Sequence, residues 1–114
     1  MSVSPITTHV LDTARGKPAE GVPIVLDKRT GGGWTRIGDG KTDADGRLKT
    51  LMPAGSLERA VYRITFDVET YFAAHGTQSF YPEAAVVFSI NDATQHYHVP
   101  LLLAPYGYST YRGS

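Results

Sequence analysis

Two of the four histidines, His9 and His98, lie in predicted β-strands, and a third, His96, directly precedes the strand of His98. Imidazole exchanges a proton near neutral pH more readily than any other side chain. His96 and His98 are two residues apart in an extended segment, so their side chains point to one face. His9 lies in the middle of a separate predicted strand. Histidines in this spacing could carry out acid–base chemistry. Taken alone, His9 or His98 is more simply interpreted as a hydrogen-bonded or surface histidine.

The same three histidines raise the question of a metal site, because imidazole binds zinc and copper. No Asp, Glu or Cys stands beside them at ligand spacing, and a pair of histidines separated by one residue is weak evidence by itself. The fourth histidine, His75, lies near the predicted end of a helix, where a cation is favoured for structural reasons. We therefore predict no metal site.

Arg47 is a further candidate, because it follows a predicted turn at residues 43–46 and begins a short strand. The pattern around it indicates a solvated charge when taken alone. Histidines and one arginine do not by themselves specify a reaction.

The last nine residues contain three of the seven tyrosines, although a chain terminus is usually loose. Tyr106, Tyr108, Thr110 and Arg112 would share one face of a strand, and a packed C-terminal edge strand is the simplest interpretation. The alternative is that residues 111–114 reach a functional site. Gly113 would then permit a close approach, and Ser114 would bring a hydroxyl and the terminal carboxylate together.

The elements that must position these residues are short strands separated by turns. Clusters of glycine and aspartate at residues 31–33, 38–40 and 43–46 predict turns. Acidic residues followed by a glycine predict one short helix within 67–76. Seven or eight such strands favour a β-sandwich in a single domain, residues 1–114. The clearest predicted strands cover residues 6–12, 22–29, 34–37, 47–50, 60–67, 85–91 and 97–104.

Composition excludes several classes of function. Eleven Lys and Arg balance eleven Asp and Glu, so the chain has no electrostatic footprint for nucleic acid or an anionic membrane. There is no cysteine, which removes disulfides and thiol chemistry. The longest apolar run is far below the roughly 20 residues of a membrane-spanning helix. No basic and apolar leader is recognisable, so we expect no secretory signal.

Taken together, these residues resemble the 5-hydroxyisourate hydrolases, the transthyretin-related enzymes of urate breakdown. The resemblance extends over nearly the whole chain, from about residue 6 to the end. Its most specific part is the terminal Tyr-Arg-Gly-Ser, which separates the hydrolases from the transthyretin hormone carriers. The other matching segments are ITTHVLD at residues 6–12, TDADGR at 42–47, FYPE at 80–83 and HYHVPLLL at 96–103.

The resemblance implies an all-β, prealbumin-like sandwich of two four-stranded sheets with one short α-helix. It also implies a homotetramer built as a dimer of dimers, whose active sites lie in clefts between the dimers and need no cofactor. The expected reaction is hydrolysis of 5-hydroxyisourate to 2-oxo-4-hydroxy-4-carboxy-5-ureidoimidazoline. Carried over by position, the expected catalytic and substrate-binding residues are His9, Arg47, His98, Tyr111, Arg112, Gly113 and Ser114.

Within this resemblance, His9 and His98 are the pair that activates and orients water, and the sequence does not say which of them accepts the proton. Arg47 would bind urate-like oxygens and stabilise developing negative charge. Ser114 would hold water or substrate, and the role of His96 stays open.

Two other interpretations remain, a transthyretin-like carrier of small ligands and an immunoglobulin-like adhesion domain. The carrier has no use for the histidine pair, Arg47 and the terminal tetrapeptide. The adhesion domain is disfavoured by the expected lack of a secretory signal and gives no reason for the tail. The terminal Arg112-Gly113-Ser114 is not a peroxisomal address of the Ser-Lys-Leu type, so we expect the cytoplasm.

Overall fold

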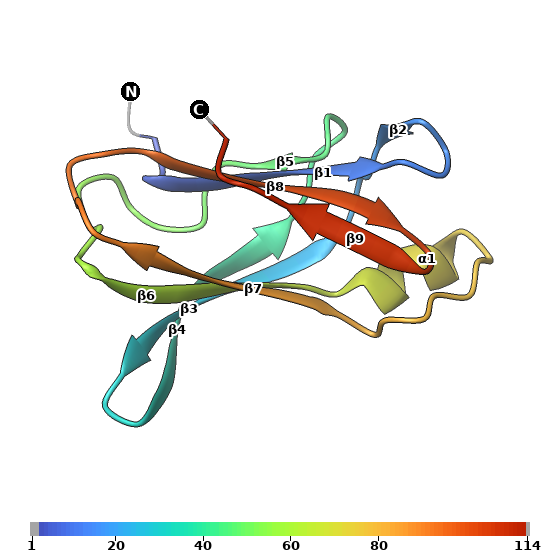
Figure 1. Cartoon of the computed structure of the whole chain (residues 1–114). Coiled ribbons are helices and arrows are strands. Elements are labelled where there is room, and N and C mark those ends of the chain that lie inside the picture. Colours follow the sequence, from blue (N-terminus) through green and yellow to red (C-terminus); the bar gives the residue numbers. More distant parts are fainter. Residues whose placement is uncertain (1–2, 114) are drawn as a thin grey trace.

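The computed structural model describes residues 3–113, which form two stacked β-sheets and one helix (Figure 1). The first sheet has the order β2-β1-β8-β9, with β5 also paired to β1, and the second has the order β4-β3-β6-β7. The strands of the first sheet are β1 (Ile6–Asp12), β2 (Lys17–Pro18), β5 (Arg47–Leu48), β8 (Tyr97–Ala104) and β9 (Gly107–Thr110). Those of the second are β3 (Pro23–Thr30), β4 (Gly33–Lys41), β6 (Ala60–Phe66) and β7 (Ala84–Ile90).

The predicted sandwich is confirmed, with one refinement in its first sheet. β1 pairs in parallel with β8, while β5 and β2 pair antiparallel with successive parts of its other edge. β5 pairs with Thr8 and His9, and β2 pairs with Leu11 and Asp12. The sheet therefore has four positions across its width, the first of which is shared by two strands of two residues each.

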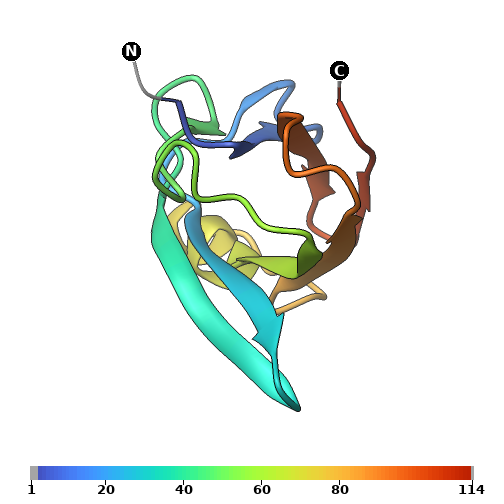
Figure 2. The same ribbon diagram turned by 90° about the vertical axis from the view of Figure 1, so that its left-hand side faces the viewer.

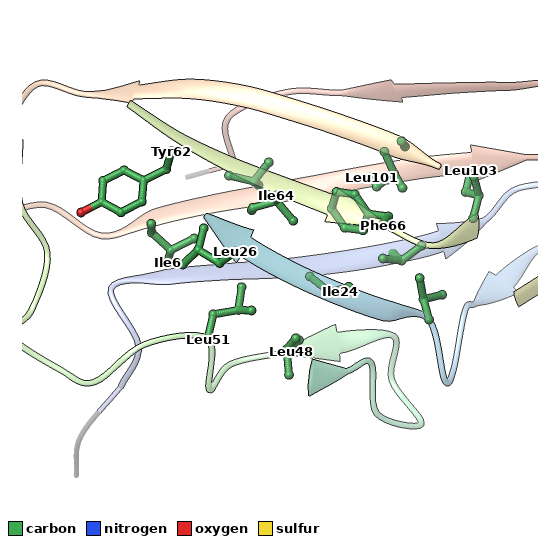
Figure 3. Packing of buried hydrophobic residues seen from close by; sticks show 14 of the residues in the cluster. Ile6, Ile24, Leu26, Leu48, Leu51, Tyr62, Ile64, Phe66, Leu101 and Leu103 are labelled. Atoms are coloured by element: carbon green, nitrogen blue, oxygen red, sulfur yellow. The ribbon is translucent and has the colours of Figure 1, made fainter. Parts of the chain in front are cut away.

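The core lies between the sheets because strand residues alternate between inward and outward faces. In β1, Ile6, Thr8 and Val10 are fully buried, and in β8 the inward residues begin with Tyr97 and Val99. Aliphatic and aromatic side chains from both sheets interdigitate around Tyr62 and Phe66 (Figure 3). The intervening residues of β1 and β8 must consequently face away from the core.

One prediction about glycines was wrong. Residues 38–40 were expected to form a turn, but β4 continues through them to Lys41. A Cβ on Gly38 would collide with the carbonyl oxygen of Leu51, and one on Gly40 would lie 3.0 Å from Cδ1 of Leu48. These glycines allow a later segment of the chain to cover the strand. β4 and β3 form a long hairpin whose tip extends beyond the sandwich (Figures 1 and 2).

The predicted helix is confirmed as α1 (Val68–Ala74). Asp67 caps its first turn, because the carboxylate accepts a hydrogen bond of 3.1 Å from the backbone N–H of Thr70. The helix buries Val68, Tyr71 and Phe72, and the Tyr71 hydroxyl donates to the buried carboxylate of Asp12 at 2.7 Å. Within residues 3–113, no helix has the length and apolarity needed to cross a membrane.

Candidate active site

The outward face of the first sheet holds His9 and Arg47 side by side. His9 points outward because its neighbours Thr8 and Val10 are buried in the core. β5 pairs with β1 in a register that makes Arg47 the direct partner of His9. Leu48, the next residue, is buried, so Arg47 faces outward on the same side as His9.

The turn at residues 43–46 contacts the ring of His9 and the backbone of Arg47. One carboxylate oxygen of Asp43 accepts hydrogen bonds from the backbone N–H groups of Asp45, at 2.9 Å, and Arg47, at 3.0 Å. The bond from Arg47 is the main cause that lowers the pKa of Asp43 below its usual value. The carbonyl oxygen of Asp45 lies 2.9 Å from Nε2 of His9. Because a carbonyl only accepts, Nε2 carries the hydrogen and Nδ1 is the free nitrogen of His9.

His98 joins this face from β8, two residues along from the partner of His9. Its backbone pairs with Thr7, and its Nδ1 lies 2.9 Å from the Thr7 hydroxyl oxygen. Burial lowers the pKa of the half-buried His98 imidazole, and the positive charge of Arg47 lowers it further, followed by those of His9 and His96. The neutral form of His98 is therefore favoured, which is the form that accepts a proton.

The C-terminal segment continues along β8 as an ordered edge strand, as the simpler sequence interpretation predicts. β9 pairs antiparallel with β8, and the Thr110 hydroxyl donates to the carbonyl of Pro100 at 2.7 Å. Beyond β9, the N–H of Gly113 donates to the carbonyl of His98 at 2.8 Å. A Cβ on Gly113 would lie 2.7 Å from Cδ2 of His98, so only glycine fits against this ring. Ser114 lies outside the described residues.

The side chains of Tyr111 and Arg112 lie on another side of the segment. Arg112 donates to the side chain of Gln95 at 2.7 Å, and its guanidinium lies 4.3 Å from the centre of the Tyr97 ring. Tyr111 and Arg112 line a cavity of about 460 Å³ between β7 and the end of the chain. The described lining of that cavity includes no histidine. A substrate-binding role for Tyr111 and Arg112 stays a prediction.

A smaller cavity of about 270 Å³ is lined by the histidines His96 and His98 together with the cations Arg47 and Lys49. We favour it over the larger one as the candidate site because of this chemistry. His9 and Gly113 do not line it and adjoin it through their backbone pairing with Arg47 and His98. Its lining residues are Val3, Thr7, Thr8, Arg47, Lys49, His96 and His98.

Thr8 of this cavity is fully buried, and sequence reasoning overlooked two polar residues on the outward face, Thr7 and Lys49. Each lies two positions from a residue that was singled out, His9 for Thr7 and Arg47 for Lys49. The period of two in an extended segment could have identified both. Among residues 3–113, no three His, Asp or Glu side chains are arranged to hold a metal ion.

A model of the HIUase/Transthyretin family matches residues 6–113. The chain belongs to this family. A 5-hydroxyisourate hydrolase from Salmonella dublin is 47% identical over 109 residues, which cover 96% of this chain and 80% of that protein. The family resemblance stated from the sequence is thereby confirmed.

Two solved structures agree with the family assignment. The 5-hydroxyisourate hydrolase of Klebsiella pneumoniae is 37% identical with a TM-score of 0.85, and the alignment covers both chains completely. Sea bream transthyretin in complex with thyroxine is 35% identical with a TM-score of 0.91, covering 96% of this chain and 94% of that one. The HIUase/transthyretin fold is thus shared by relatives named 5-hydroxyisourate hydrolase and by a transthyretin solved in complex with thyroxine.

Proposed function

We propose that this chain hydrolyses 5-hydroxyisourate, opening its six-membered ring to give 2-oxo-4-hydroxy-4-carboxy-5-ureidoimidazoline. The observation that supports this most strongly is the outward face on which His9 and Arg47 are direct partners beside a half-buried His98. The hydrolase names of the relatives point to the same reaction.

The reaction adds water to a ring carbonyl carbon and breaks the adjoining carbon–nitrogen bond. The product consequently carries a new carboxylate and a ureido group, and the departing nitrogen receives a proton. His98 is suited to take the proton of water, because Thr7 holds Nδ1 and leaves Nε2 available. His9 has its Nδ1 available in the same way. A positioned base of this kind contributes on the order of 10²–10⁴-fold to the rate.

Arg47 supplies the positive charge that hydrolysis of a carbonyl requires. Its planar guanidinium donates several hydrogen bonds in a fixed geometry, which suits urate-like oxygens and the oxyanion that develops on them. Tyr111, Arg112, Gly113 and Ser114 complete the site in this proposal, with Ser114 holding water or substrate by a hydrogen bond. Gly113 already contacts the backbone of His98 in the single chain.

We also propose that the working form is a homotetramer, a dimer of dimers. β7 and β9 are the last strands of their sheets, so both have one edge available to pair with a second copy. The outward face of the first sheet includes Leu11 and Leu102, which are only half-buried in the single chain. Contact between two such faces would cover apolar surface and enclose the cavity beside His98.

The competing function is a carrier of small ligands, which the similarity to a thyroxine-bound transthyretin brings into consideration. A carrier needs the fold and the assembly but no base, and a half-buried histidine beside Arg47 would only add polar groups to its binding surface. Turnover separates the two functions, since a carrier lowers the free ligand concentration without forming product.

The test is to generate 5-hydroxyisourate from urate with urate oxidase, add the protein and follow the decay of its absorbance. We expect catalytic amounts of protein to accelerate the decay far above the spontaneous rate. Treatment with a chelator should leave the rate unchanged, since we expect no metal. Decay at the spontaneous rate with a large excess of substrate over protein would contradict the proposed function.

A further inference from the structure

The hydroxyl of Thr7 lies between two histidine rings that come from the neighbouring strand segment. Its oxygen is 2.9 Å from Nδ1 of His98 and 2.9 Å from Nε2 of His96. Thr7 is only 5% exposed, and its backbone pairs with His98. His96 is exposed to solvent, whereas His98 is half-buried. The hydroxyl therefore connects a ring in contact with bulk water to the ring that faces the candidate site.

The Thr7 hydroxyl contacts two ring nitrogens but has one hydrogen, which it can donate to only one of them at a time. A hydroxyl donates one hydrogen bond and accepts others, while a neutral imidazole has one nitrogen that donates and one that accepts. When Thr7 donates to His96, it must accept from His98, whose Nδ1 then carries the hydrogen and whose Nε2 has a free lone pair. When His96 donates to Thr7, the hydroxyl hydrogen is free to be donated to Nδ1 of His98, and in that arrangement Nε2 of His98 carries the ring hydrogen instead.

We propose that Thr7 and His96 are positioning residues that select the tautomer of His98. Neutral His96 accepts from Thr7 and so keeps Nε2 of His98 free to act as a base. Protonated His96 donates through Nε2, which reverses the hydroxyl and places a hydrogen on Nε2 of His98. The chain then loses its base although His98 itself has not been protonated.

This assignment gives His96, whose role the sequence leaves open, a definite one as a pH-dependent control on the site. It rests on the proposed function only where it refers to turnover, because the tautomer of His98 is a property of the unliganded protein.

The two rings lie in different surroundings, since His96 is exposed and His98 is half-buried. Burial, followed by the positive charges of Arg47, His9 and His96, lowers the pKa of His98, so His98 keeps its neutral form below the usual pH range of histidine. The other charged groups at the cavity are Arg47 and Lys49, both cationic at neutral pH. Arg112 approaches His96 from the C-terminal segment, donating to its backbone carbonyl at 3.4 Å.

The direct test is nitrogen-15 NMR of the imidazole rings across a pH titration, without substrate. We expect His98 to carry its hydrogen on Nδ1 when His96 is neutral and on Nε2 once His96 is protonated. Thr7→Val keeps the branched shape but removes the hydroxyl, and it should abolish this change, whereas Thr7→Ser should preserve it. An unchanged His98 tautomer in the wild type throughout the His96 titration would overturn the proposal.

A second variant guards against local disruption by Thr7→Val. His96→Gln removes the titrating ring at an exposed position, so His98 should keep one tautomer down to its own protonation. His75→Gln is the matched control, because it removes an exposed histidine on the far helix and should leave the switch intact. A His98 tautomer that still changes with pH in His96→Gln would show that another group controls it.

The kinetic consequence is measured separately. Thr7→Val should lower kcat by about 10-fold with little change in KM, since part of the contribution of a positioned base is lost. His96→Gln should move the acidic limb of the pH–rate profile to lower pH. If NMR shows the pH-dependent change of the His98 tautomer and the wild type does not hydrolyse 5-hydroxyisourate, the roles of Thr7 and His96 stand and the proposed function fails. Wild-type turnover without this change would reject the roles of Thr7 and His96 alone.

Discussion

At the scale of single residues, His98 is fixed by contacts on three sides. Thr7 binds Nδ1, the backbone N–H of Gly113 binds the His98 carbonyl, and the Gly113 Cα region packs against the ring. His9 is fixed in a similar way by the carbonyl of Asp45. Each ring thus has one nitrogen held by the protein and one left for chemistry.

The contact between Gly113 and the His98 ring gives a specific prediction. Gly113→Ala places a methyl group 2.7 Å from Cδ2, so the ring or the chain end must move, and we expect kcat to fall at least 10-fold. Gly107→Ala is the matched control, because nothing lies within 4 Å of its new methyl group. Thermal melting should show both variants folded. Equal kcat values for the two variants would contradict the packing described here.

The lowered pKa of His98 gives a second prediction. His98 stays neutral at pH values below the usual pKa of histidine, and it becomes protonated only as the pH falls through its own lowered pKa. Arg47→Met removes a positive charge but not the burial, so the pKa should rise only part of the way, as measured by NMR titration. In the unfolded chain, His98 takes up its proton at a higher pH than in the folded protein. The free energy of unfolding therefore falls as the pH drops from the usual pKa of histidine towards the lowered pKa of His98. A pKa unchanged by Arg47→Met would contradict the assigned cause.

At the scale of elements, β1 and β8 carry two histidines of the candidate site, and two short segments bring the other residues to them. The turn at residues 43–46 sets the register of β5 and so places Arg47 beside His9. The segment after β9 returns to β8, where the backbone of Gly113 pairs with that of His98. The long strands carry His9 and His98, and these short segments bring Arg47 and Gly113 beside them.

Removal of residues 111–114 tests the role of the C-terminal segment. β9 keeps its pairing with β8, so the fold should persist, with about 1 kcal/mol lost for the bond from Gly113 to His98. We expect turnover to fall strongly, because the groups that adjoin His98 are gone. Circular dichroism checks the fold and substrate decay checks the activity. Full activity in the shortened chain would show that the segment is only an edge strand.

The sequence predicts most of the elements correctly because their signals are local. The alternation in Ile6–Asp12 and Tyr97–Ala104 identifies both strands to the residue, and Asp67 and Gly76 bound the helix. The glycines at 38 and 40 mislead because their purpose is a contact with residues 48–52, which no local pattern reveals.

The site shows the same division between local and non-local information. The faces of His9 and His98 follow from alternation, and Thr7 and Lys49 could have been found by the same rule. The different contacts made by neighbouring residues of the C-terminal segment could not be predicted, because they depend on pairing with β8. There the backbone of Gly113 adjoins His98 while the Arg112 side chain turns towards Tyr97.

At the scale of the whole molecule, the site is open in the single chain. The cavity beside His98 lies on an outward sheet face, and β7 and β9 each end a sheet with one edge available for pairing. A second and third copy would therefore change the surroundings of the site as well as the stability of the protein.

Assembly can be tested with one substitution on each outward face. Leu102→Lys places a charge on the outward face of the first sheet. We expect sedimentation to show tetramers for the wild type and dimers for this variant. Val61→Lys is the matched control on the outward face of the second sheet and should remain tetrameric. A wild type that sediments as a monomer at micromolar concentration would contradict the proposed assembly.

The most direct test of the central claim is the initial rate of 5-hydroxyisourate decay with His98→Asn and His9→Asn, each compared with the wild type. Asparagine keeps a polar side chain on the strand but cannot take up a proton near neutral pH. We predict that each variant loses most of the rate, on the order of 100-fold, while its assembly stays that of the wild type. Wild-type rates in both variants would contradict the assignment of this histidine face as the hydrolytic site.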